Sequence, residues 1–183
     1  MKKRVKSALS GTKTEQNLKT AASGEAMAYT KYTLFSDIAK KEGYEEIADV
    51  FSSFAGNEKE HAEIWLEYLG EIGDTKTNLK NAASGEGFES GEFYPDASKT
   101  AYDEGFSEIG DKFRMTGTVE KSHEGEYKKI SKETENGEAF SGGAETTWTC
   151  LNCGYTVKGN TPPDRCPLCS YPKGYFAKEK DCG

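Results

Sequence analysis

The apolar residues of the first 134 positions recur at steps of three and four, the spacing of one face of an α-helix. Turn signals at Gly43, at Gly70 to Asp74 and at Gly105 divide this part of the chain into four such segments. The second segment shows the pattern most fully, in a stripe formed by Ile47, Phe51, Phe54, Glu58, His61, Trp65 and Tyr68. Four consecutive amphipathic helices predict an all-α four-helix bundle.

An internal repeat organises these helices. Residues 17–25 (NLKTAASGE) return as residues 78–86 (NLKNAASGE), 61 positions later and with one mismatch. The Glu-Lys-Glu-His of residues 58–61 returns as Glu-Lys-Ser-His at residues 120–123, which is 62 positions later. The chain therefore contains two homologous helical hairpins, and the second has one additional residue.

Glycine, serine and threonine are frequent in residues 135–147, where the helical period ends, and this composition predicts a flexible linker. All five cysteines lie beyond residue 149. We therefore expect a bundle in residues 1–134, a linker in 135–147 and a separate small domain in 148–183. That last domain has too few apolar residues for its own core, so a bound metal is expected to hold it together.

The net charge limits the kinds of partner that the protein is expected to bind. Charged residues make up 30% of the chain and the net charge is −7, so a basic surface for nucleic acid or anionic lipid is not expected. The start, Met1 to Arg4, resembles the basic region of a signal peptide, but no apolar stretch follows it and no run approaches the roughly 20 apolar residues that span a bilayer. We expect a cytoplasmic protein, in which paired cysteines bind metal more often than they form disulfides.

Glutamates occupy positions on the apolar stripes of all four helices. A lone buried carboxylate costs several kcal/mol unless it is paired or metal-bound, and a single case is most often a solvated edge. Here four coincide, and two of them belong to Glu-x-x-His motifs that place carboxylate and imidazole one turn apart and contain the only two histidines. The six candidate metal ligands are Glu25, Glu58, His61, Glu86, Glu120 and His123.

This set matches a known pattern, that of ferritin-like di-iron carboxylate proteins, in which two helices give one Glu each and two give Glu-x-x-His. Oxygen-rich sites with two histidines suit iron or manganese better than structural zinc. Two such metals can deliver two electrons together, which suits reduction of an O–O bond. Glu89, one turn beyond Glu86, is a seventh candidate, although its residue type alone is equally compatible with a solvent-facing side chain; its repeat counterpart Ala28 cannot bind metal.

Four cysteines form two chelating pairs, Cys150-x2-Cys153 and Cys166-x2-Cys169, which predict a tetrahedral metal site. The spacing fits zinc as well as mononuclear iron, and a neighbouring redox-active metal pair favours iron. Cys182 lies outside both pairs and is expected to be a free thiol without a role.

From Thr14 to about Phe176 the chain resembles the rubrerythrin family, through Gly24-Glu25, Asn57-Glu58-Lys59-Glu60-His61, Gly85-Glu86-x-x-Glu89 and a rubredoxin-like Cys-x2-Cys-Gly-Tyr with a later Cys-Pro-x-Cys. The resemblance implies a ferritin-like bundle followed by a rubredoxin-like domain. It also implies that Glu58 and Glu120 bridge two irons.

In the family pattern, Glu25 is a terminal ligand of one iron, and Glu86 and His123 are ligands of the other. Glu89 and His61 would be alternative ligands of the first iron, exchanged as the pair changes oxidation state.

Two tyrosines, Tyr32 and Tyr94, match residues that hydrogen-bond the ligand carboxylates in the family. The family reduces hydrogen peroxide to water, with electrons passing from a reduced pyridine nucleotide through a reductase or a rubredoxin to the cysteine-bound iron and then to the iron pair. Homodimers or homotetramers are expected. The alternatives are ferritin-type Fe(II) oxidation and storage, and an electron carrier or redox sensor.

Three residues depart from simple expectation. Ser170 follows the last cysteine where the family often has glycine, and could disturb an amide that faces sulfur. Gly117 lies inside the fourth helix, at a cost of about 1 kcal/mol. Pro95 should interrupt and kink the third helix, as in the family pattern.

Overall fold

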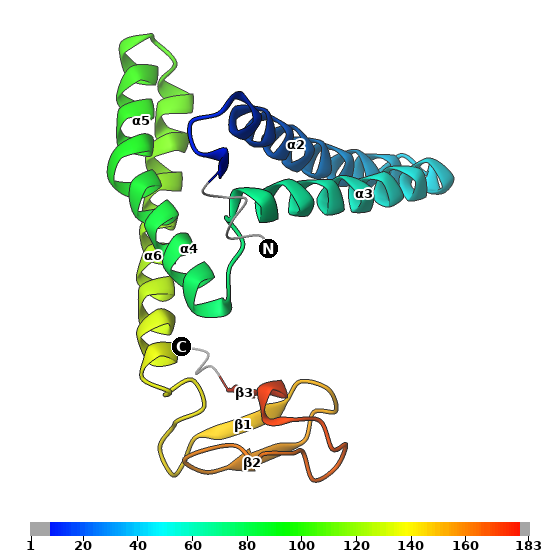
Figure 1. Ribbon diagram of the computed structural model, residues 1–183, viewed down its shortest axis with the longest axis vertical. Coiled ribbons are helices and arrows are strands. Elements are labelled where there is room, and N and C mark those ends of the chain that lie inside the picture. Colours follow the sequence, from blue (N-terminus) through cyan, green and yellow to red (C-terminus); the bar gives the residue numbers. More distant parts are fainter. Residues whose placement is uncertain (1–7, 180–183) are drawn as a thin grey trace. The chain divides into compact units, whose positions relative to one another are not determined.

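The computed structural model describes residues 8–179, so Met1 to Arg4 and Cys182 lie outside the described residues. The chain divides between Thr77 and Asn78 into two compact units (Figure 1). Among the described helices, none has a stretch long and apolar enough to cross a membrane.

The first unit is a hairpin of two long helices, α2 (Lys13–Lys41) and α3 (Glu45–Leu69), which run side by side (Figure 1). Thr12 caps α2, because its hydroxyl accepts a hydrogen bond from the Glu15 backbone N–H at 3.1 Å. The turn between the helices uses Gly43 with φ 83°, a conformation that favours glycine. The turn predicted here is confirmed.

The leading helix of the second hairpin begins just before the unit boundary and has three parts, α4 (Thr75–Phe88), the π-helix η1 (Glu89–Phe93) and α5 (Tyr94–Asp103). It pairs with α6 (Ser107–Glu135) across a turn at Gly105. Pro95 lacks a backbone N–H and its ring crowds the carbonyl four residues earlier, so the α-helical ladder changes to a π-turn just before it. The interruption predicted at Pro95 is thus present.

The internal repeat is visible at the level of single hydrogen bonds. The Ser36 hydroxyl donates to the Ala48 carbonyl at 2.9 Å, and the Ser98 hydroxyl donates to the Gly110 carbonyl at 2.8 Å. Both serines are buried, and each bond joins the two helices of its hairpin at the same point of the repeat. The two hairpins therefore share one helix register.

The buried residues of the second helix of each hairpin, most of them small, lie at intervals of seven or fourteen and form a seam toward the partner helix. On α3 the buried positions are Ala48, Ala55, Ala62 and Leu69; on α6 they are Gly110, Glu124 and Ser131. The stripe expected to be core splits in two beside this seam. The ligand glutamates are half-buried, whereas the line of Ile47, Phe54, His61 and Tyr68 is exposed, since it points away from the partner helix of its own hairpin.

The cysteine-rich part forms a three-stranded antiparallel sheet of β1 (Thr147–Cys150), β2 (Thr156–Lys158) and β3 (Phe176–Lys178), in the order β2-β1-β3. A 3-10 turn, η2 (Lys173–Tyr175), precedes β3. The core of this cysteine-rich part consists of two aromatic residues and two cysteines: Trp148, Phe176, Cys150 and Cys166.

The segment between α6 and β1 lies partly against this core. Phe140 packs on it, and the Gly142 backbone N–H donates to the Asn160 carbonyl at 2.6 Å. The boundaries 1–134, 135–147 and 148–183 remain a prediction.

Candidate metal centres

The first group of candidate ligands, called the first triad, consists of Glu25 on α2 with Glu58 and His61 on α3. Their ligand atoms all lie within 4.8 Å of one another. His61 Nδ1 lies 2.9 Å from Glu58 Oε2, as expected for residues one helical turn apart. Glu25 and Glu58 are half-buried and the imidazole is exposed. Three metal-binding side chains therefore converge from the two helices of one hairpin.

The second triad repeats this arrangement with Glu86 on α4 and with Glu120 and His123 on α6, again within 4.8 Å. His123 Nδ1 lies 2.8 Å from Glu120 Oε2 and 3.6 Å from Glu86 Oε2. The structure thus brings together the three predicted ligands of each hairpin.

Glu86 shows most clearly that this site is built for a cation. Its Oε2 is buried and has no hydrogen-bond partner. Burial raises the pKa of the Glu86 carboxyl, and the neighbouring carboxylate of Glu120 raises it further. A buried carboxylate oxygen without a donor is costly unless a cation binds it, so the second triad fits the iron that its donor set suggests.

Glu89 stands outside the second triad. It is exposed and is the first residue of η1, one turn beyond Glu86. Its charge nevertheless reaches the site, because it contributes to the raised pKa values of Glu86 and Tyr94. Its role as a seventh ligand remains a prediction.

The two candidate tyrosines are held by aromatic contacts. Tyr32 lies 6.3 Å from Phe51 between ring centroids, and Tyr94 lies 6.1 Å from Phe113, which is the repeat equivalent. Burial raises the pKa of the Tyr94 phenol, with further contributions from nearby carboxylates, Glu89 first among them. The Tyr94 hydroxyl therefore keeps its proton and is suited to donate it in a hydrogen bond to a carboxylate.

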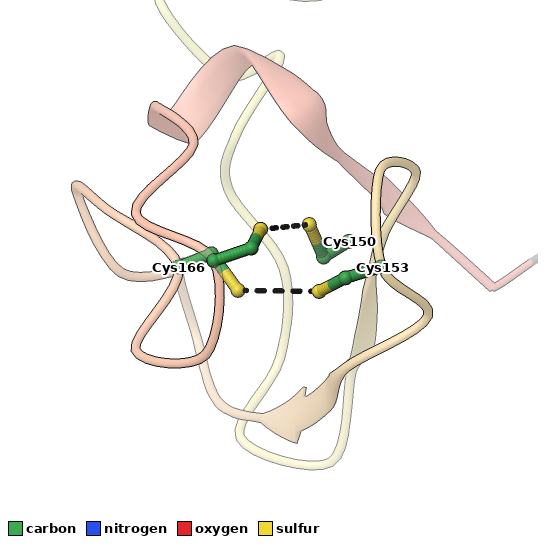
Figure 2. A group of neighbouring side chains, drawn as sticks. Cys150, Cys153 and Cys166 are labelled. Carbon is green, nitrogen blue, oxygen red and sulfur yellow. Dashed lines mark hydrogen bonds between the residues drawn. The ribbon is translucent and has the colours of Figure 1, made fainter.

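The four predicted cysteines come together as well. Cys150 Sγ lies 3.7 Å from Cys169 Sγ, and Cys153 Sγ lies 3.6 Å from Cys166 Sγ. Figure 2 shows the sulfurs of Cys150, Cys153 and Cys166 turned toward one another. These distances exclude a disulfide. A tetrahedral site with metal–sulfur bonds of about 2.3 Å has sulfurs roughly 3.8 Å apart, so the spacing fits one metal ion.

Backbone amides act on the pKa values of two thiols in this site, and the net shifts differ. A hydrogen bond from the Tyr171 backbone lowers the pKa of the Cys169 thiol to about 6. The Tyr155 backbone acts on Cys153 in the same way, but burial and the other thiols outweigh it and raise the pKa of Cys153 to about 12. The four thiols thus share protons that a metal ion would displace.

Ser170 adopts φ 62°, close to the φ 76° of Gly154 at the same place in the first cysteine pair. The Ser170 N–H donates to the Cys166 carbonyl at 2.8 Å, as the Gly154 N–H does to Cys150. Ser170 therefore forms the same turn as Gly154, and the disturbance expected from a non-glycine residue takes the form of backbone strain.

Glu124 is a buried residue that the sequence patterns did not single out. It lies on the seam of α6 at 7% exposure, and it forms ion pairs with Lys121 at 2.7 Å and with Lys128. Hydrogen bonds from these two lysines lower the pKa of the Glu124 carboxyl to about 2. The only signal in the sequence is its spacing of seven from Gly117, together with lysines three residues before it and four after it.

Comparison with known proteins agrees with these centres. The family model described as Rubrerythrin matches residues 16–131, and the model described as Rubrerythrin, rubredoxin-like domain matches residues 148–177. The chain belongs to the rubrerythrin family. Because the family model covers most of the helical part, the resemblance stated from the motifs is confirmed.

Three curated rubrerythrins are similar over nearly the whole chain. The protein named Rubrerythrin from Porphyromonas gingivalis is 40% identical over 98% of this chain and 96% of its own length. Rubrerythrin-1 of Clostridium acetobutylicum is 40% identical over 92% of this chain and 95% of its own. Rubrerythrin of Nitratidesulfovibrio vulgaris is 35% identical over 92% and 95%.

Membership in the rubrerythrin family, together with the geometry, confirms the predicted fold class, an all-α ferritin-like four-helix protein with a C-terminal rubredoxin-like knuckle. It also confirms the predicted cofactors, a di-iron centre and a mononuclear iron held by four cysteines. Rubrerythrins are oxidoreductases generally linked to oxidative stress, and the rubredoxin-like domain implies electron transfer.

Proposed function

We propose that this protein is a non-haem di-iron peroxidase that reduces hydrogen peroxide to water. The observation that supports the proposal most is the presence of two equivalent triads and a four-thiolate site in one chain. Peroxide reduction consumes two electrons and two protons and yields two molecules of water. When bound, the iron pair would supply the two electrons, and the cysteine-bound iron would replace them one at a time.

The residues of the two triads would hold the iron pair, with Glu58 and Glu120 as bridging ligands. Glu25, Glu86 and His123 would complete the first coordination sphere, as the family pattern implies. Glu86 supports this assignment, because its buried Oε2 needs a positive partner.

Glu89, together with His61 of the first triad and two tyrosines, would adjust the pair. Glu89 and His61 would exchange as ligands between oxidation states. Tyr32 and Tyr94 would orient the ligand carboxylates by donating hydrogen bonds. The raised pKa of Tyr94 keeps that phenol protonated for this role.

Electrons would reach Cys150, Cys153, Cys166 and Cys169 from a reduced pyridine nucleotide, through a reductase or a rubredoxin. The protein would act as a homodimer or homotetramer in the cytoplasm. These partners follow from the family resemblance and from the electron-transfer role of the rubredoxin-like domain.

The decisive experiment supplies iron-loaded protein with a reduced pyridine nucleotide and a rubredoxin reductase, and measures peroxide consumption. Glu120→Gln should lower turnover at least 100-fold, because a bridging ligand is lost. The matched control is Glu126→Gln, which removes an exposed carboxylate from the same helix and should leave turnover unchanged.

Absence of turnover with both iron sites filled would overturn the proposal. A zinc-filled knuckle in the native protein would do so too, because zinc cannot pass electrons. Ferritin-type storage, the alternative, requires a large hollow shell, and light scattering that shows a dimer or tetramer counts against it.

A further inference from the structure

The additional residue of the second hairpin can be located from the structure. Before it, the buried residues Ala22 and Ala83 occupy equivalent places 61 positions apart. After it, the buried serines Ser36 and Ser98 make the same hydrogen bond and lie 62 positions apart. The π-helix η1 lies between these two equivalent points. The first hairpin has no counterpart, because α2 is continuous from Lys13 to Lys41.

The π-turn absorbs the extra residue. The Tyr94 backbone N–H donates to the carbonyl of Glu89, five residues earlier, in place of the four of an α-helix. An extra residue in a regular α-helix would rotate everything after it by about 100°. Because η1 widens one turn, Tyr94 keeps the same place in the repeat as Tyr32, and Ser98 keeps that of Ser36.

The π-turn affects how Tyr94 packs on α6. A Cβ atom added to Gly117 would lie 3.0 Å from the Tyr94 Cβ, closer than nearly all such contacts. In the first hairpin the equivalent position is Ala55, which has a Cβ and is buried without conflict beside the helix of Tyr32. The first hairpin thus accommodates a Cβ at this position, whereas in the second hairpin a Cβ would crowd Tyr94, which lies close to α6. Gly117, unexpected for a helix, is explained by this approach.

The π-helix also supplies a second ring contact. Phe93, its last residue, packs edge-on against Tyr94 with centroids 5.1 Å apart, and Phe113 of α6 lies on Tyr94 at 6.1 Å. Burial raises the pKa of the phenol so fixed, and the charges of Glu89, Glu120 and Glu86 raise it further.

We propose that η1 is a positioning device, in which the residue added to the second repeat presses Tyr94 against Gly117 and so fixes its phenol beside the second triad. Tyr94 would thereby be held differently from Tyr32, and the surroundings of the second triad would differ from those of the first. The effect on iron rests on the proposed function, whereas the packing of Tyr94 does not.

The test is a double-mutant cycle on the full, iron-loaded chain, with thermal unfolding as the readout. The first change deletes Gly91, which removes one residue of η1 without removing any side chain, so every proposed ligand residue is still present. The second change is Gly117→Ala. Gly91→Ala is the control that keeps the length of η1, since a Cβ at Gly91 would meet nothing within 4 Å.

In the native background, Gly117→Ala should lower Tm by roughly 5 °C, because the added methyl group meets Tyr94. In the deletion background, it should leave Tm unchanged or raise it, since Tyr94 would withdraw to the position that Tyr32 has beside Ala55. An equal loss in both backgrounds would refute the proposal.

A second measurement tests the proposal even when the deletion variant fails to fold. Helix propensity alone predicts that Gly117→Ala stabilises the chain, so a rise in Tm would refute the close approach. The iron-dependent absorption gives an independent readout: Gly117→Ala should change it in the same direction as Tyr94→Phe, and Gly91→Ala should not change it. Because neither readout uses peroxide, an inactive protein would still show the packing effect.

Discussion

At the scale of single residues, the buried carboxylate of Glu124 leads to the clearest prediction. It lies on the seam of α6 and is held by Lys121 and Lys128. Such a group cannot lose its charge without leaving two ammonium groups unpaired around a buried side chain. Its effect on stability is therefore tied to pH.

Glu124 should make stability fall in acid. Its pKa in the folded chain is about 2, below the ordinary value of 4.5, so the stabilisation is complete above pH 4.5 and is lost as pH falls toward 2. Unfolding measured at pH 7, 4.5 and 3 should show a steeper loss of Tm for the native chain than for Glu124→Gln. Parallel losses in the two proteins would contradict this role.

Ser170 offers a prediction of opposite sign. A non-glycine residue at φ 62° costs about 1 kcal/mol, and Ser170→Gly should remove that cost, less a few tenths for the greater freedom of the unfolded chain. Gly154→Ser is the matched reverse change and should destabilise the knuckle by about 1 kcal/mol. Denaturant midpoints followed by the absorption of the thiolate-bound iron would measure both, and a loss of stability in Ser170→Gly would disprove the strain.

At the scale of elements, the ends of helices are set by local groups. The N-cap of α2 combines the Thr12 hydroxyl with the Glu15 carboxylate, which accepts from the Gly11 N–H at 2.7 Å. Thr12→Ala should therefore cost about 1 kcal/mol of unfolding free energy, whereas Thr14→Ala, an exposed change two residues on, should cost little. Urea unfolding followed by circular dichroism compares them, and equal midpoints would show that the cap contributes nothing.

Much of the element-scale picture was predictable because it is local. The turns at Gly43 and Gly105 require a positive φ, and the two triads follow from the three-residue spacing of Glu58 with His61 and of Glu120 with His123. The π-helix was not predicted, although the change of offset between the repeats required an extra residue to be placed somewhere. One extra residue can be accommodated in a helical bulge or in a loop, and only the packing of Tyr94 on α6 decides which of the two forms.

The helix seam was also missed, for a different reason. Reading the stripe by hydrophobicity placed Ile47 and Phe54 in the core, yet the residues that meet inside the hairpin are Ala48, Ala55 and their equivalents. Alanine has little apolar surface, so it gives a weak periodic signal. It is nevertheless the residue that lets two helices approach most closely.

At the scale of the whole molecule, the two kinds of metal site differ in what they support. The helices form their own backbone hydrogen bonds and seams, whereas two of the four buried core residues of the knuckle are cysteines. Removing the metal from the knuckle would leave four mutually repelling or protonated thiols around Trp148. The knuckle should therefore depend on its metal far more than the hairpins do.

A strong chelator should unfold the knuckle and leave helical circular dichroism nearly unchanged. In a Trp65→Phe background, Trp148 is the single tryptophan, and its emission should move to longer wavelength as it loses its buried position. Emission that stays constant while the metal is removed would show that the knuckle holds its fold without metal.

The alanine seam of α3 has a consequence for how this sequence can vary over evolution. Ala48 is fully buried at 0% exposure, and Ala55 and Ala62 follow it at 4% and 7%. At such positions any larger side chain would push the helices apart and shift the glutamates that flank the seam. A complete mutational scan should therefore find these chemically inert alanines about as intolerant of change as the ligands themselves, and purifying selection would act on them for their lack of a side chain.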